Sequence, residues 1–190
     1  MTRPVTTKNA LLSGLTFTDV SVHSAYPGTT GANEIASSVR AAIVVNAASG
    51  GSRALNAAAD VSVPASTVRW LGFWNGSTFV ESAPNGGFTP RNFMSIASSD
   101  LIYSEAHGYS DTNQIVFFNG NPPAPLVEGT IYFVRDATTD SFKVAATSGG
   151  VAIDLTAATS FGCIVCRITE DVYASPGTHT LSTATFVVPD

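Results

Sequence analysis

Short runs of β-branched and aromatic residues, separated by polar turns, dominate the hydrophobic pattern of this chain. Residues 68–74, 114–118 and 130–134 are three such runs, and each has the length and composition of a β-strand. Asn-Gly and Gly-Gly pairs, which are typical of tight turns, follow several of the runs. The pattern predicts an all-β fold: a β-sandwich frame with a short N-terminal helix and an inserted small β domain.

Two hairpins can be placed from the turn residues. Asn75-Gly76 separates the apolar pair 73–74 from the apolar pair 79–80, as expected for a tight hairpin. Residues 136–140, between the runs 133–135 and 141–144, predict a second hairpin.

Only the N-terminus has a helical pattern. Residues 7–15 place Ala10, Leu11, Leu12 and Leu15 along one stripe. Thr6 or Thr7 is the expected N-cap.

The strand around residue 72 is unusual because both of its faces are apolar. Successive side chains of a strand alternate between its faces, so Trp70 and Trp74 share one face and Leu71 and Phe73 the other. A strand buried on both sides is central in its sheet. Core packing is therefore favoured over an exposed aromatic platform for a sugar or a protein.

The pattern changes twice along the chain. Residues 94–169 share a hairpin-rich pattern, and a last strand is expected at 185–188. We therefore expect a frame of residues 1–93 and 170–190, interrupted by an inserted module of residues 94–169. Such an insertion is physically reasonable because closing a longer loop costs little entropy.

Composition and charge narrow the class of protein. Charged residues make up 12% of the chain and hydrophobic residues 44%, and this charged fraction is about half that of typical soluble domains. It suits an exterior covered by neighbouring subunits, although plain β domains also show it. The net charge of −5, with scattered basic residues, argues against a nucleic-acid partner. Neither a membrane span nor a signal peptide is recognisable, so synthesis in the cytoplasm is expected.

The loop of residues 23–35 is the richest candidate for chemistry. A catalytic interpretation has Glu34 orienting His23 as a base for a nearby serine. No Gly-x-Ser-x-Gly motif accompanies it. A hydrogen-bonded loop, in which His23 and Asn33 satisfy backbone groups, is the favoured interpretation.

Other reactive side chains have structural interpretations. Asp136 and Asp140 flank a predicted turn, and Glu170 with Asp171 is interpreted as a solvated linker between the modules, although paired carboxylates also suggest glycan hydrolysis. Cys163 and Cys166 lie in a strand-like run and are expected to be buried structural cysteines rather than a redox or zinc pair. No catalytic residue, metal site or cofactor is expected.

Three aromatic side chains in a polar segment are the candidate exposed contacts. Tyr103, His107 and Tyr109 lie close to Gly108, and they are the residues through which the insert would touch a partner.

The frame resembles a family of small virion proteins of tailed bacteriophages, described as minor tail, tail-fibre-like or head-decoration proteins. The matching segments are residues 8–12, 22–28, 31–35, 47–51, 67–74 and 177–181. The chain departs from the family pattern at Tyr26, where aspartate is common, at Val39-Arg40, and at Asn75-Gly76, which replaces a longer turn. The insert resembles a β module of phage tail and fibre proteins through residues 111–117, 125–134 and 137–144.

The resemblance implies a non-enzymatic structural component of the virion, made in the host cytoplasm and assembled in symmetric copies with other tail or capsid proteins. It implies attachment through the N-terminal arm, residues 1–8, and through a candidate assembly loop: His23, Tyr26, Pro27, Gly28, Gly31, Asn33 and Glu34. The tail is slightly favoured over the head. A host-receptor or glycan-binding module presented on the particle is the alternative, and an enzyme is the third hypothesis.

Overall fold

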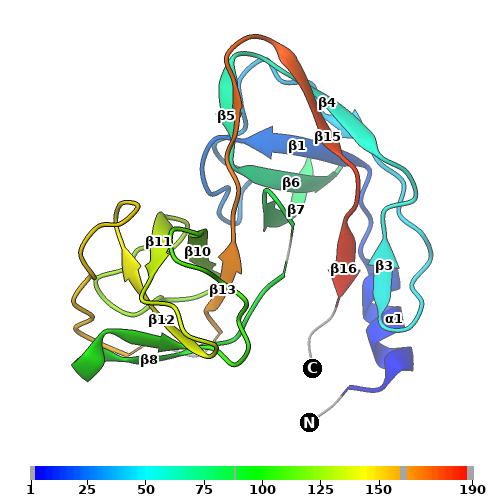
Figure 1. Ribbon diagram of the computed structural model, residues 1–190. Helices are drawn as coiled ribbons and strands as arrows, with labels where there is room; N and C mark the ends of the chain where they lie inside the picture. Colours follow the sequence, from blue (N-terminus) through cyan, green and yellow to red (C-terminus); the bar gives the residue numbers. More distant parts are fainter. Residues whose placement is uncertain (1–2, 88, 159–161, 188–190) are drawn as a thin grey trace. The chain divides into compact units, whose positions relative to one another are not determined.

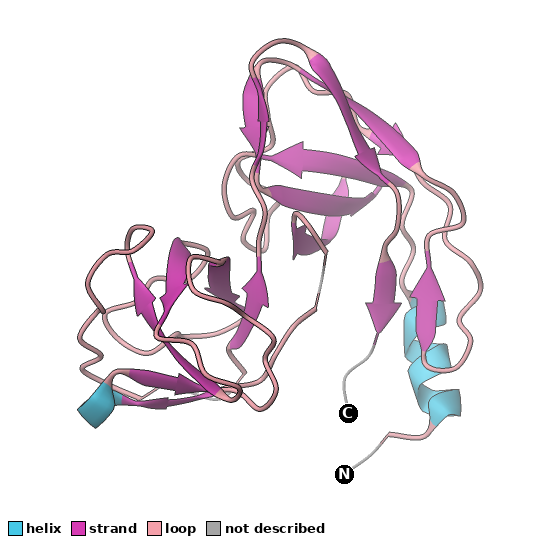
Figure 2. Cartoon of the chain, in the orientation of Figure 1, coloured by secondary structure: helices cyan, strands magenta, loops and turns pink. Residues whose placement is uncertain are grey.

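The computed structural model describes residues 3–87, 89–158 and 162–187 and confirms an all-β chain with a short N-terminal helix (Figures 1 and 2). It contains two compact units, which we call the frame unit, residues 1–85 and 170–190, and the inserted unit, residues 86–169. The return to the frame lies where the sequence pattern placed it. The chain leaves the frame unit earlier than predicted, after residue 85, so residues 86–93 belong to the inserted unit.

The frame unit is built on a four-stranded antiparallel sheet in the order β2-β1-β6-β7. Its other strands form two-stranded ribbons, β3 with β16, β4 with β15 and β5 with β14. The elements of this unit are α1 (Val5–Gly14), β1 (Asp19–His23), β2 (Ala41–Ala42), β3 (Ser52–Ala54), β4 (Ala59–Val63), β5 (Ser66–Val68), β6 (Trp70–Asn75), β7 (Thr78–Pro84), β14 (Asp171–Tyr173), β15 (Gly177–Leu181) and β16 (Thr185–Val187).

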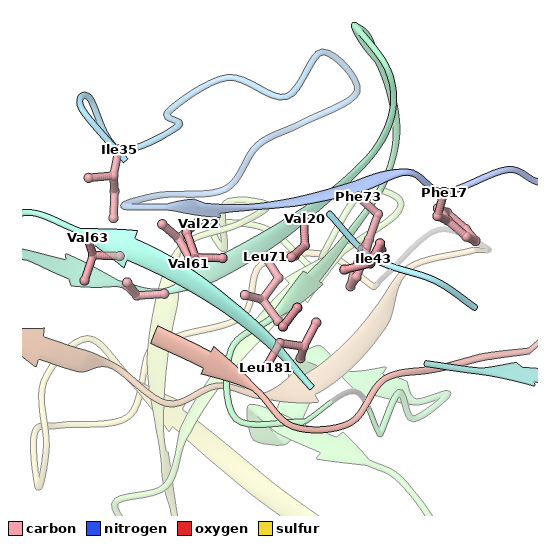
Figure 3. Close-up of a cluster of buried hydrophobic side chains, with 12 residues drawn as sticks. Phe17, Val20, Val22, Ile35, Ile43, Val61, Val63, Leu71, Phe73 and Leu181 are labelled. Carbon is pink, nitrogen blue, oxygen red and sulfur yellow. The ribbon is translucent and has the colours of Figure 1, made fainter. Parts of the chain in front are cut away.

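The main core of the frame unit lies between the β1–β6 sheet and the β4–β15 ribbon, in a sandwich-like arrangement of two layers. Val20 and Leu71 of the sheet and Val61 and Leu181 of the ribbon are buried in one cluster (Figure 3). The alternating burial of β4, with Ala59, Val61 and Val63 inward, is the strand periodicity expected when one face meets a core.

Strand β6 is central, as the apolar pattern predicted. It pairs with β1 on one side and β7 on the other, and Trp70, Leu71, Phe73 and Trp74 are all buried. Core packing of both tryptophans is thus confirmed. The predicted hairpin at Asn75-Gly76 joins β6 to β7, with Asn75 opposite Thr78.

Helix α1 begins earlier than its pattern suggested, and the predicted threonine cap is wrong. Pro4 occupies the N-cap position without a side-chain capping bond. A residue far away in the sequence binds the C-terminal end of the helix: Arg53 Nη1 donates to the carbonyls of Leu12 at 2.9 Å and Leu15 at 2.6 Å. The carbonyl of Leu12 also accepts from the N–H of Leu15 at 3.2 Å, whereas the carbonyl of Leu15 lies past the helix end, where no turn of helix follows to supply a donor.

The inserted unit is a six-stranded antiparallel sheet that curls into a small barrel. Its order is β13-β10-β11-β12-β9-β8. The backbone of Arg91, just before β8, exchanges two hydrogen bonds with Val165 of β13, at 2.8 and 3.0 Å, which links the two ends of the sheet. The elements are β8 (Met94–Ile96), the 3-10 turn η1 (Ala97–Ser99), β9 (Leu101–Tyr103), β10 (Gln114–Phe118), β11 (Ile131–Arg135), β12 (Ser141–Ala145) and β13 (Ile164–Arg167).

Candidate functional site

The 23–35 loop folds over the face of the frame sheet that lies opposite the main core. The β1–β6 register places His23 opposite Trp70, Ser21 opposite Gly72 and Asp19 opposite Trp74. These side chains share one face because alternate residues of a strand point the same way. The sequence pattern therefore builds a second buried layer beneath the loop.

The loop satisfies its own polar groups. The N–H of Ser24 donates to the carbonyl of Asn33 at 3.1 Å, and that of Ala32 donates to the carbonyl of Pro27 at 2.9 Å. Asn33 Nδ2 donates to the carbonyl of Tyr26 at 2.8 Å. The hydrogen-bonded loop expected from the sequence is thus confirmed for Asn33.

His23 links this loop to the sheet. Its Nδ1 lies 2.7 Å from the carbonyl oxygen of Ala32, and since a carbonyl can only accept, Nδ1 carries the proton. Burial lowers the pKa of His23, an effect larger than the opposing influence of the Ala32 carbonyl and Glu34. The imidazole is therefore neutral, and its Nε2 accepts a hydrogen bond.

Ser21 and Trp74 complete a buried chain of hydrogen bonds. The hydroxyl of Ser21 lies 2.7 Å from His23 Nε2, to which it donates, and it accepts from Trp74 Nε1 at 2.7 Å. The sequence analysis did not identify these two partners. The alternation Ser21-x-His23 on one strand is the signal that could have indicated the first of them.

The serine and histidine lie at the distance of a nucleophile and its base, but they are sealed. Ser21 and His23 each have 0% of their surface exposed. Glu34 does not orient His23: its carboxylate accepts two hydrogen bonds from Arg40, at 2.9 and 2.7 Å. The arrangement orders the loop and gives no substrate access to the hydroxyl.

Arg40 closes the outer side of this layer. Its guanidinium carbon lies 3.4 Å from the ring centroid of Trp74, within the range of a cation–π contact. The paired carboxylate of Glu34 raises the already high pKa of Arg40. The indole of Trp74 is thereby held on its face by a cation and at its nitrogen by Ser21.

Two glycines make the layer possible. A Cβ on Gly72 would meet His23 Nε2, Ser21 Oγ at 2.7 Å and the ring of Phe79, and one on Gly31 would meet the rings of Trp74 and Phe79. Gly31 also has a φ of +75°, a conformation that strongly favours glycine. A side chain at either position would displace the buried groups.

The residues predicted as an assembly loop differ in their access to a partner. His23, Pro27 and Gly31 are buried, and Tyr26 is half-buried with its ring 4.8 Å from that of Trp70. Asn33 is exposed. Gly28 and Glu34 are half-buried. A partner could therefore reach Asn33 more readily than the buried members of the loop. The role of the loop in assembly stays a prediction.

The candidate contacts of the inserted unit are only partly exposed. Tyr103 has 39% of its surface exposed, whereas His107 has 3%, so the prediction of an exposed contact is wrong for His107. Its ring packs 5.0 Å from Phe142, and its Nδ1 accepts from the N–H of Tyr109 at 2.9 Å. Tyr109 is half-buried, and burial raises the pKa of its phenol.

The carboxylate pairs have structural contacts. Asp136 and Asp140 flank the predicted β11–β12 hairpin, and Asp140 Oδ1 accepts from the N–H of Ala106 at 2.8 Å. The interpretation of Glu170 and Asp171 as a solvated linker holds only in part: the side chain of Asp171 is 45% exposed, but Asp171 begins strand β14 and both carboxylates have partners. Glu170 forms an ion pair with Arg69, and Asp171 accepts a hydrogen bond from Asn85.

Both cysteines are free and buried, as expected. Cys163 belongs to the core of the inserted barrel. Burial raises the pKa of the Cys166 thiol to about 11, which keeps it protonated and unreactive at neutral pH.

Within residues 3–87, 89–158 and 162–187, no three His, Cys, Asp or Glu side chains gather in a way that would hold a metal ion. In the same part of the chain, no helix has the length and apolar character needed to cross a bilayer.

Comparisons of the chain with protein-family models, with curated proteins and with solved structures gave no match.

Proposed function

We propose that this chain is a non-enzymatic structural protein of a bacteriophage virion, in the tail tip or fibre or as a decoration of the head. The sealed layer beneath the 23–35 loop carries the proposal. Its serine, histidine and tryptophan hydrogen-bond to one another and hold a loop whose sequence resembles that of phage virion proteins. This supports a structural role for the residues that most resemble catalytic ones. The partners are other virion proteins and further copies of the chain.

The surface of helix α1 supports attachment through the N-terminal part of the frame unit. Leu11 at the helix surface and Leu15 just after its end have 49% and 40% of their area exposed. Aliphatic side chains exposed on a helix of low charge suit burial against a neighbouring subunit. The attachment surface therefore extends from the predicted arm into the helix.

Serine substitution at Leu11 and Leu15 is expected to reduce incorporation of the chain into particles at least about tenfold, because two partly buried leucines at an interface contribute more than 1.4 kcal/mol. Copy number in purified particles, counted by mass spectrometry, is the measurement. Val151→Ser is the matched control, since Val151 is 85% exposed and lies in the inserted unit.

The proposal would be abandoned if the unmodified chain were absent from purified particles. Hundreds of copies per particle would indicate a head decoration or tail tube, and a handful would indicate the tail tip or fibre. Equal incorporation of the leucine variants and the control would place attachment elsewhere on the frame.

A second candidate, a glycan- or receptor-binding module, is favoured by one depression on the inserted unit. It is a shallow, open depression of about 480 Å³ lined by Ala106, Gly108, Tyr109, Ser110, Thr138 and Thr139. The hydroxyl-bearing residues Ser110, Thr138 and Thr139 beside this depression suit hydrogen bonding to a neutral sugar. Thr139→Arg, which fills the depression from an exposed position, is expected to abolish adsorption in normally assembled particles if this module recognises the host.

A further inference from the structure

The two points at which the chain leaves and re-enters the frame unit are tied together by side chains. Asn85 Nδ2 donates to Asp171 Oδ2 at 2.9 Å, and the N–H of Asn85 donates to the carbonyl of Arg69 at 2.8 Å. The side chain of Arg69 in turn pairs with Glu170. Residues on both sides of the insertion point therefore share one set of contacts.

His179 of β15 contacts the same carboxylate oxygen. Its Nδ1 lies 3.5 Å from Asp171 Oδ2 and 3.2 Å from Tyr173 Oη. The phenol of Tyr173 donates its one proton to the carbonyl of Thr178 at 3.1 Å, so Nδ1 of His179 is the donor to Oη. We call Asn85, Asp171, Tyr173 and His179 the junction cluster.

The groups around His179 set its charge. His179 is buried, and burial lowers its pKa, an effect larger than the opposing one of the Asp171 carboxylate. Asp60 of the paired strand β4 accepts from the hydroxyl of Thr180 at 2.6 Å, and neighbouring residues of a strand point to opposite faces. Asp171 and the phenol of Tyr173 are thus the titratable groups in contact with the imidazole among the described residues.

We propose that the junction cluster is an acid-sensitive clasp on the two ends of the inserted unit. A second proton on His179 places a positive charge on a buried imidazole, a cost that the contact with Asp171 does not offset, so the cluster opens to hydrate the charge. The hydrogen bond between Asn85 and Asp171 then weakens, and the ends of the insert are held less firmly. The clasp does not depend on the virion role of the chain.

The direction of the pH effect follows from the pKa. The pKa of His179 is lowered in the folded chain below its ordinary value of 6.5, so the unfolded or opened form binds the proton more tightly. The clasp is fully present above pH 6.5 and is lost as the pH falls through the lower pKa of the folded state.

Amide hydrogen exchange of the full chain tests the proposal. Between about pH 7.5 and about pH 5, protection at Asn85 and along β14, corrected for intrinsic exchange, is expected to fall, because the opened form binds the proton on His179 more tightly. In the His179→Gln variant, the protection of these amides should be the same at both pH values. Amides of the β10–β11 pair in the inserted unit serve as the internal reference.

A proton-detected NMR titration keeps the test valid if His179→Gln does not fold. The side-chain amide signals of Asn85 are expected to follow the titration of His179 in the unmodified chain. In Asp171→Asn, which retains an acceptor oxygen but no charge, they should no longer follow it. The proposal would be overturned if the Asn85 signals did not change as His179 titrates, or if amide protection were the same across the pH range.

Discussion

Gly72→Ala is expected to destabilise the frame unit by about 4 kcal/mol, since overpacking of a core and loss of a buried hydrogen bond each cost about 1 to 3 kcal/mol. The new methyl group would press against Ser21 Oγ, His23 Nε2 and Phe79. Ser21 and His23 cannot withdraw from the methyl group without straining the hydrogen bond between them. The substitution therefore disrupts both the packing and the hydrogen bonding around Gly72.

Denaturant unfolding followed by tryptophan fluorescence measures this effect. The chain has two tryptophans, Trp70 and Trp74, and both belong to the frame unit, so the emission reports that unit without a signal from the barrel. Gly14→Ala is the matched control, because its new Cβ would meet nothing within 4 Å. A midpoint for Gly72→Ala equal to that of the control would contradict the packing described here.

Ser21→Ala is expected to cost about 3 kcal/mol, because it leaves a buried donor and a buried acceptor unpaired, and each such group costs about 1 to 3 kcal/mol. The donor is Trp74 Nε1 and the acceptor is His23 Nε2. The same fluorescence-detected unfolding gives the free energy, and the emission of the folded state should shift because the indole loses its hydrogen bond.

Ser24→Ala is the control for this second substitution. Its hydroxyl makes one long hydrogen bond, 3.4 Å to the carbonyl of Asn33, near the surface, so its loss should cost less than about 0.5 kcal/mol. If Ser21→Ala were as mild as Ser24→Ala, the hydroxyl of Ser21 would not be the link between the indole and the imidazole.

The strands and the central position of β6 could be predicted because they rest on local patterns. Alternation of apolar residues places Trp70 and Trp74 on one face whatever the partner strand is. The helix could be recognised for the same reason, but not its ends. The carbonyls at its C-terminal end accept hydrogen bonds from Arg53, a contact with a residue far away in the sequence.

The candidate site could be predicted only in part. A hydrogen-bonded 23–35 loop follows from its turn residues, yet the partners of His23 depend on the β1–β6 register, which brings Gly72 and Trp74 to the same face. The burial of His107, a loop residue, depends on its contact with Phe142 of strand β12. Register and tertiary contact are not encoded in the spacing of neighbouring residues.

The proximity of Asn85 and Asp171 also makes this point of the frame a natural acceptor site for foreign domains. A hydrogen bond of 2.9 Å between their side chains fixes how far apart the ends of any grafted segment have to be. A domain whose own termini lie close together can be fused there at a small cost in loop entropy. A fluorescent reporter or an affinity tag of that kind, placed between Asn85 and Glu170, is expected to fold there while the frame strands keep their native pairing.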